Sequence, residues 1–154
     1  MKGNSHTFLE INISYLNNKK LVINMKEYIP KDVQEFGDDV LQMVTSPSAR
    51  CLFVVGKVRE LQGRMLDTFH YVVMQFLWIV YRGRPYFAID ISYLCIRMKH
   101  PDISYWNKLK RVLCFVNSKI ENKRITGANN LHEMEKCANS YHAVHMVMRG
   151  NTGG

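Results

Sequence analysis

The sequence predicts an α+β protein with an N-terminal β-hairpin, a bundle of three main helices and a set of C-terminal strands. Three observations predict this class: apolar and polar residues alternate in residues 8–25, apolar residues recur at helical spacing in residues 69–116, and strand-like runs return after residue 120. A chain of 154 residues with 47% hydrophobic content can bury a core. We divide the chain into residues 1–25, 26–120 and 121–154.

The alternating N-terminal segment is expected to form a hairpin with its turn at residues 17–20, which read Asn-Asn-Lys-Lys. Asn24, with Glu27 three residues later, is a capping pattern and predicts a short helix that ends at Gly37. A long loop is expected to follow up to Gly63, with a short strand at residues 51–55.

Three amphipathic helices are expected in the central region. The first covers residues 69–80, where apolar residues recur at i, i+3, i+4 and i+7. Pro85 suits the first turn of a second helix, so the chain should break just before it, and Pro101 ends that helix. The third helix is expected to be apolar on one side, with Trp106, Leu109, Leu113 and Val116, and basic on the other, with Lys108, Lys110 and Arg111.

Beyond residue 120, residues 123–127 and 134–141 are expected to be strands joined by a turn at Asn129-Asn130. Residues 149–154 are rich in glycine and polar residues. We expect this tail to pack against nothing.

The charge of the chain is compatible with an anionic partner and equally with a basic surface that binds no partner. Twenty-one Lys and Arg against thirteen Asp and Glu give a formal net charge of +8, which suits nucleic acid or an anionic membrane surface. The longest apolar run, residues 71–81, is shorter than the roughly 20 residues of a spanning helix. The N-terminus lacks the apolar core of a signal peptide, so we expect an intracellular protein of the cytoplasm or nucleus.

Two groups of polar residues resemble catalytic or metal sites but are not expected to act as such. Asp38-Asp39 follows a predicted helix and not a hairpin between apolar strands, so it should be a solvated turn. Cys137, His142 and His145 offer only three donors with no matching cluster elsewhere, so no metal site is expected.

Three ordered blocks in the helical region carry a family resemblance. They are Arg82-Gly-Arg84-Pro85-Tyr86, then Cys95-Ile-Arg97-Met-Lys99-His-Pro101, then Tyr105-Trp106-Asn-Lys108-Leu-Lys-Arg-Val-Leu113. In this order they resemble the polyprotein of copia-type long-terminal-repeat retrotransposons. The resemblance implies that residues 1–25 are the end of a reverse transcriptase palm, that residues 26–120 are its thumb and connection region, and that residues 121–154 are the truncated start of ribonuclease H.

The resemblance also implies which functional residues are present. Phe8-Leu9-Glu10-Ile11 resembles the primer-grip strand of the family, with Glu10 in place of a glycine. Asn139 stands where the family has a metal-binding Asp of ribonuclease H, and a neutral amide holds Mg²⁺ weakly. The polymerase carboxylates of the family would precede this strand. We therefore expect a non-catalytic fragment that uses no Mg²⁺ cofactor and is not an enzyme.

Two functions follow as expectations. The first is nonspecific, salt-dependent binding to nucleic acid such as a template-primer duplex. The residues expected to bind are Phe8, Leu9, Arg97, Lys99, Lys108, Lys110 and Arg111. The alternative is a domesticated helical interaction module, whose exposed apolar surface binds a protein and which has no role with nucleic acid.

Overall fold

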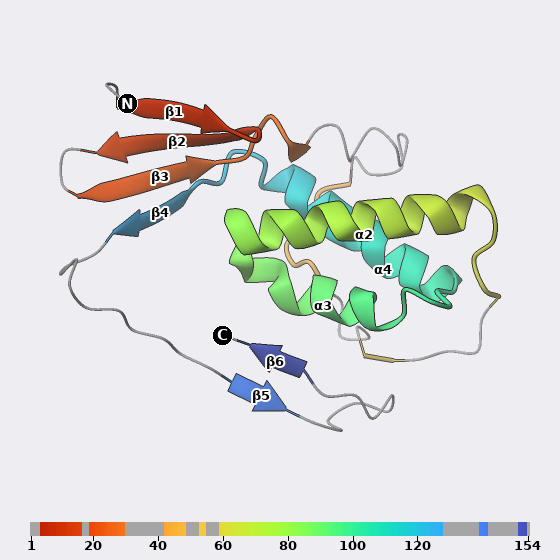
Figure 1. The fold of residues 1–154 in the computed structure, drawn as a ribbon. Helices are drawn as coiled ribbons and strands as arrows, with labels where there is room; N and C mark the ends of the chain where they lie inside the picture. Colours follow the sequence, from red (N-terminus) through yellow and green to blue (C-terminus); the bar gives the residue numbers. More distant parts are fainter. Residues whose placement is uncertain are drawn as a thin grey trace.

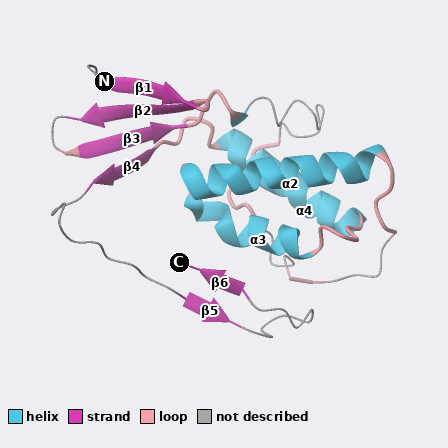
Figure 2. Ribbon diagram, in the orientation of Figure 1, coloured by secondary structure: helices cyan, strands magenta, loops and turns pink. Residues whose placement is uncertain are grey.

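In a computed structural model, the structure describes residues 4–16, 19–29, 42–48, 53–54, 59–127, 139–141 and 151–153, the last two ranges by their backbone alone. The predicted α+β class is confirmed, with antiparallel strands at the N-terminus followed by three helices (Figures 1 and 2). The elements are β1 (Ser5–Phe8), β2 (Ile11–Leu16), β3 (Lys20–Asn24), α2 (Arg64–Arg82), the 3₁₀-helix η2 (Pro85–Phe87), α3 (Ala88–Ile96), α4 (Ile103–Ser118), β4 (Arg124–Gly127), β5 (Asn139–Tyr141) and β6 (Asn151–Gly153).

The N-terminal strands form three strands of a sheet where the sequence predicts two. Phe8 ends β1 and pairs with Ile11, so Leu9 and Glu10 form a two-residue turn that the prediction missed. Both residues have positive φ, 49° and 61°, as tight mirror-image hairpin turns require. The pattern concealed this turn because Leu-Glu lacks the Asn or Gly that usually marks one. The turn predicted at residues 17–20 falls between β2 and β3, but Lys20 already belongs to β3, and residues 17 and 18 lie outside the described residues.

The fourth strand of this sheet is β4, which follows the last helix and lies about 100 residues after β3 in the sequence. The strand order is β1-β2-β3-β4, and Ile23 of β3 lies opposite Arg124 of β4. Residues 123–127 were expected to pair with residues 134–141, but β4 pairs with β3 and β5 pairs with β6. The tail, expected to be unpaired, contains β6. Alternation predicts that a segment is a strand, but not which distant strand it will pair with.

The three predicted helices are confirmed and pack beside the sheet. The chain runs down α2, turns at Gly83, returns along α3 and passes back along α4 toward β4 (Figure 1). Pro85 opens η2, and Asp102 caps α4 by accepting hydrogen bonds from the backbone N–H groups of Ser104 (2.7 Å) and Tyr105 (3.1 Å). Among the core residues that lie fully inside are Phe69, Val72, Phe76, Ile79, Ile91, Leu94, Leu109, Leu113 and Val116.

The remaining predictions are met in part. The Asn24 side chain accepts a hydrogen bond from the Lys26 N–H (3.0 Å), but most of the expected short helix lies outside the described residues. Of the strand expected at residues 51–55, only Phe53 and Val54 are described, and neither is in a strand. Trp106 packs against the core but is only partly buried. Within the described part of the chain, no helix has the length and hydropathy needed to cross a membrane.

The buried carboxyl of Asp90 is expected to weaken the fold at neutral pH. Asp90 is 4% exposed, and one of its oxygens has no hydrogen-bond partner. Burial raises the pKa of this carboxyl, although a hydrogen bond from Ser48 opposes the rise. Because the unfolded state ionises first as pH rises, this group costs stability above the ordinary Asp pKa and costs none once both states are protonated. Asp90→Asn should therefore raise the unfolding free energy by about 1–3 kcal/mol at neutral pH.

Urea denaturation at neutral and at acidic pH checks this expectation. The gain from Asp90→Asn should shrink as the pH falls, and a gain of equal size at both pH values would contradict it. Asp67→Asn is the matched control, since Asp67 is exposed in the first turn of α2 and its loss should cost a few tenths of a kcal/mol.

Candidate nucleic-acid interface

The lysine predicted to face nucleic acid from the centre of α4 is engaged within the protein. The Lys108 ammonium donates a hydrogen bond to the Val54 carbonyl (2.8 Å) and lies 4.6 Å from the ring centre of Tyr105 and 5.3 Å from that of Tyr93. Cation–π contacts of this kind stabilise partly buried cations. Lys108 therefore joins a loop to two helices.

Arg97 approaches the same aromatic pair. Its guanidinium carbon lies 5.9 Å from the Tyr105 ring centre, and the rings of Tyr93 and Tyr105 stack with their centres 5.7 Å apart. The two hydroxyls are 3.1 Å apart. Burial, and then the hydrogen bond to Tyr105, raise the pKa of Tyr93 above the ordinary tyrosine value. The structure thus brings Arg97 and Lys108 together, but around aromatic rings inside the helical layer.

The other predicted residues do not complete a single basic face. Arg111 reaches the Ser46 hydroxyl (3.4 Å), so the segment at residues 42–48 lies against this side of α4. Lys110 is partly buried, whereas Lys99 is exposed in the turn after α3. Phe8 and Leu9 are 66% and 58% exposed at the tip of the β1–β2 hairpin. The hairpin belongs to the sheet, and the α3–α4 turn lies at the opposite end of the helical layer (Figure 1).

A second basic surface, which the sequence prediction missed, lies where α4 leads into β4. Lys119, Lys123 and Arg124 are all exposed there. A pocket of about 300 Å³ opens between this segment and the turn after α2. Its lining residues are Gly83, Arg84, Pro85, Tyr86, Asn122, Lys123 and Arg124.

Arg84 lines this pocket and links the turn after α2 to the segment between α4 and β4. The side chain is 2% exposed, and its guanidinium donates hydrogen bonds to the carbonyls of Lys119 (2.8 Å), Ile120 (2.6 Å) and Asn122 (3.0 Å). These carbonyls follow the C-terminus of α4, where the helix dipole favours a positive charge. The buried charge is therefore balanced by backbone carbonyls.

The acidic residue nearest to this surface is neutralised by a partner. Glu121 forms an ion pair with Lys26, and the hydrogen bond from that lysine lowers the pKa of the glutamate. Lys20 of β3 lies opposite Gly127, three residues along β4 from Arg124, and so belongs to the other face of the sheet. We call Lys119, Lys123, Arg124 and the pocket beside them the β4 basic surface.

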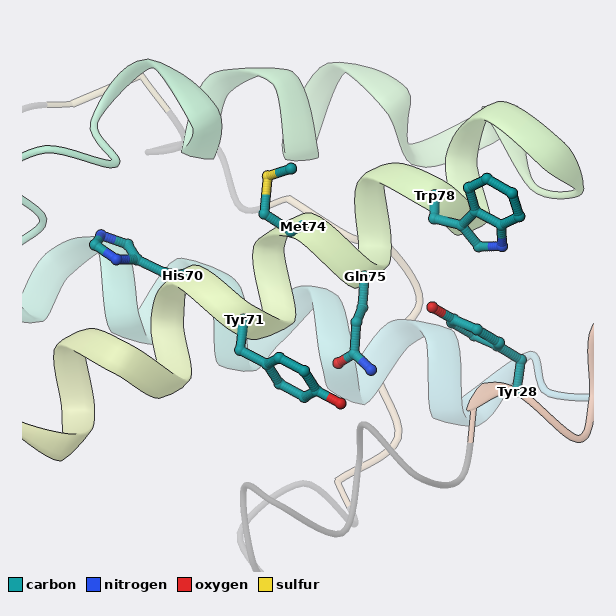
Figure 3. A pocket seen from close by; sticks show the side chains of 6 residues that line it. All are labelled: Tyr28, His70, Tyr71, Met74, Gln75 and Trp78. Atoms are coloured by element: carbon teal, nitrogen blue, oxygen red, sulfur yellow. The ribbon is translucent and has the colours of Figure 1, made fainter. Parts of the chain in front are cut away.

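A shallow apolar groove lies along α2 and also includes Tyr28, from the segment after β3 (Figure 3). Its volume is about 530 Å³, and Met74 and Tyr71 on its floor are about half exposed. The guanidinium of Arg82 stacks over the ring of Trp78, which also lines the groove, at 4.6 Å. The lining residues are Tyr28, His70, Tyr71, Met74, Gln75 and Trp78.

No metal-binding group is found among the described residues, since no three His, Cys, Asp or Glu side chains cluster there. The structure describes only the backbone of Asn139, which lies in β5. Also outside the described residues are Asp38, Asp39, Cys137, His142 and His145.

Comparisons with known proteins give no match: no protein-family model, no curated protein and no solved structure matches this chain. The resemblance to retrotransposon polyproteins therefore rests on the sequence motifs alone.

Proposed function

We propose that this protein binds nucleic acid without sequence preference, as a non-catalytic segment of a copia-type reverse transcriptase and ribonuclease H polyprotein. The observation that carries the binding proposal is the β4 basic surface, where exposed Lys123 and Arg124 line a pocket and exposed Lys119 lies at the end of α4. The excess of Lys and Arg in the whole chain supports it. Asn139, in place of a carboxylate, supports the absence of hydrolysis.

The family part of the proposal is supported by what the resembling blocks do in the structure. Arg84 ties the end of α4 to the turn after α2, and Pro85 opens η2. Pro101 lies in the α3–α4 connection, where its carbonyl accepts a hydrogen bond from the Leu61 N–H (2.8 Å). The blocks thus contain residues that join the helices, which suits a scaffold that positions a duplex and performs no chemistry.

Binding of this kind is driven by phosphate neutralisation. Each cation that meets a phosphate releases a condensed counterion, so the logarithm of affinity falls with the logarithm of salt concentration. With three phosphate contacts, the expected slope is about −2 on a single strand and about −3 on a duplex. The affinity should not depend on base sequence.

Replacing Lys119, Lys123 and Arg124 together by alanine should weaken binding to a template-primer duplex by at least tenfold. It should also make the slope of log affinity against log salt concentration less negative by about 2–3. Fluorescence anisotropy over a series of salt concentrations measures both quantities. Circular dichroism first establishes that each variant folds.

The matched control removes three predicted contacts, Lys99, Lys110 and Arg111, and so the same amount of charge. If the two triple variants lose affinity equally, net charge and not the β4 basic surface accounts for the binding. If only the control loses affinity, the contact lies on the helical layer instead.

The alternative function, a protein-interaction module, is favoured by the apolar groove on α2. Exposed apolar patches of this kind mark interaction sites when they are contiguous. Light scattering and a pull-down with the whole chain discriminate the two functions. A monomer that captures no protein and still binds the duplex would exclude the module.

A further inference from the structure

We propose that the pocket between η2 and β4 binds a single phosphate group, with Tyr86, Lys123 and Arg124 as its ligands and the buried charge of Arg84 beside them. The inference rests on the proposed function, because the bound nucleic acid would supply this phosphate as a backbone diester. One phosphate held in a pocket would fix the register of the strand, while the surrounding cations would add only general attraction.

A count of hydrogen-bond donors on Arg84 leaves none that a ligand in the pocket can reach. A guanidinium has five N–H groups. One terminal nitrogen donates to the Lys119 carbonyl (2.8 Å) and to the Tyr86 hydroxyl (3.4 Å), and the other donates to the carbonyls of Ile120 (2.6 Å) and Asn122 (3.0 Å). The fifth group, Nε–H, is buried and finds no acceptor among the described residues. Because this nitrogen is buried away from the pocket surface, Arg84 offers a bound anion its positive charge and not a free N–H donor.

Tyr86 supplies a hydrogen-bond donor that a ligand can reach. Its hydroxyl oxygen accepts the hydrogen bond from Arg84, so its own proton can be donated to another group. The ring is held by edge contacts to Phe87 and Phe115, with centres 5.4 Å and 5.9 Å away, yet the residue remains about half exposed. The hydroxyl is therefore held beside the guanidinium at the open pocket.

Charge favours an anion at this place. Arg84, Lys123 and Arg124 each carry a positive charge on the pocket lining, and the lining contains no acidic residue. The nearby Glu121 is already paired with Lys26. The donors come from two chain segments, residues 84–86 and 123–124. Such an arrangement suits a tetrahedral phosphate, whose oxygens point in several directions, better than a planar carboxylate.

The test is a titration of the whole chain with inorganic phosphate at constant ionic strength, followed by nuclear magnetic resonance. The backbone amide resonances of Arg84, Tyr86 and residues 122–124 should shift together. Tyr86→Phe should weaken phosphate binding about 3- to 10-fold, and Lys123→Ala with Arg124→Ala by at least tenfold. Arg84 itself is left intact because it holds the fold together.

The controls are Tyr81→Phe on exposed α2 surface and Lys99→Ala beyond α3, neither of which lines the pocket. Both should leave phosphate affinity unchanged. Acetate should bind more weakly than phosphate. Equal binding of acetate, shifts that centre elsewhere, or a wild-type affinity in Tyr86→Phe would overturn the proposed site.

The same variants separate this inference from the proposed function. If the chain binds phosphate in the pocket but has no affinity for a duplex, the phosphate site is supported and the proposed function is overturned. If the chain binds a duplex, but inorganic phosphate does not compete and Tyr86→Phe has no effect, the proposed function is supported and the phosphate site is overturned.

Discussion

Replacing Arg84 with alanine is expected to lower the free energy of unfolding by about 3–5 kcal/mol, because three hydrogen bonds from a charged donor are lost and such bonds contribute about 1.5–3 kcal/mol each without being additive. The guanidinium is buried, so water does not substitute for it in the native fold. The carbonyls of Lys119, Ile120 and Asn122 would lose their shared donor, and the removed side chain would leave a cavity. The end of α4 would then be held less firmly to the turn after α2.

Urea denaturation followed by circular dichroism measures this loss. Arg82→Ala is the matched control, since Arg82 is exposed and only stacks on Trp78, so its loss should cost about 1 kcal/mol or less. Arg84→Lys should recover only part of the loss, because an ammonium cannot reach three carbonyls as a planar fork does. Equal destabilisation by the changes at residues 82 and 84 would refute the anchoring role of Arg84.

The role of Arg84 could not be predicted from the sequence, although the helices around it could. The helices follow from local signals, namely apolar spacing and the prolines at residues 85 and 101. The partners of Arg84 lie 35 to 38 residues further along the chain, and no local pattern indicates which carbonyls a single arginine will meet. The same limit applies to β4, which pairs with a strand about 100 residues earlier.

The turn at Leu9 and Glu10 escaped prediction for a different reason. Positive φ at two consecutive positions favours glycine or asparagine, and neither residue is present. The resembling family has a glycine at the position of Glu10. The structure gives that position φ 61°, a conformation that glycine adopts without strain.

The basic face of α4 was predicted from the usual rule that the polar side of an amphipathic helix faces solvent. The rule fails here for Lys108 and Arg111, because the segments at residues 42–48 and 53–54 pack against that side and accept hydrogen bonds from them. The path of a loop depends on contacts that are distant in sequence. One signal could have indicated the β4 basic surface, namely the three cations within residues 119–124. The acidic residue among them, Glu121, is paired with Lys26.

The second large effect is expected at Tyr105, the ring that Arg97 and Lys108 share. Tyr105→Ala should lower the free energy of unfolding by about 3–5 kcal/mol, because a fully buried aromatic side chain is removed. The change also takes away the stacking partner of Tyr93 and the ring beside two partly buried cations. Urea denaturation measures this loss, and a variant with the same free energy of unfolding as the wild type would contradict the packing role of Tyr105.

Tyr105→Phe separates the ring from its hydroxyl. It keeps the stacking and the cation contacts but removes the hydrogen bond to Tyr93, so it should cost only about 1 kcal/mol. It should also lower the pKa of Tyr93, which is raised first by burial and then by Tyr105. Because a raised tyrosine pKa costs stability as the pH climbs past the ordinary tyrosine value, this variant should lose less stability at alkaline pH than the wild type. An ultraviolet titration of the tyrosines measures the pKa, and urea denaturation at neutral and alkaline pH measures the stability. A pKa of Tyr93 that is unchanged in Tyr105→Phe would show that the two hydroxyls are not coupled.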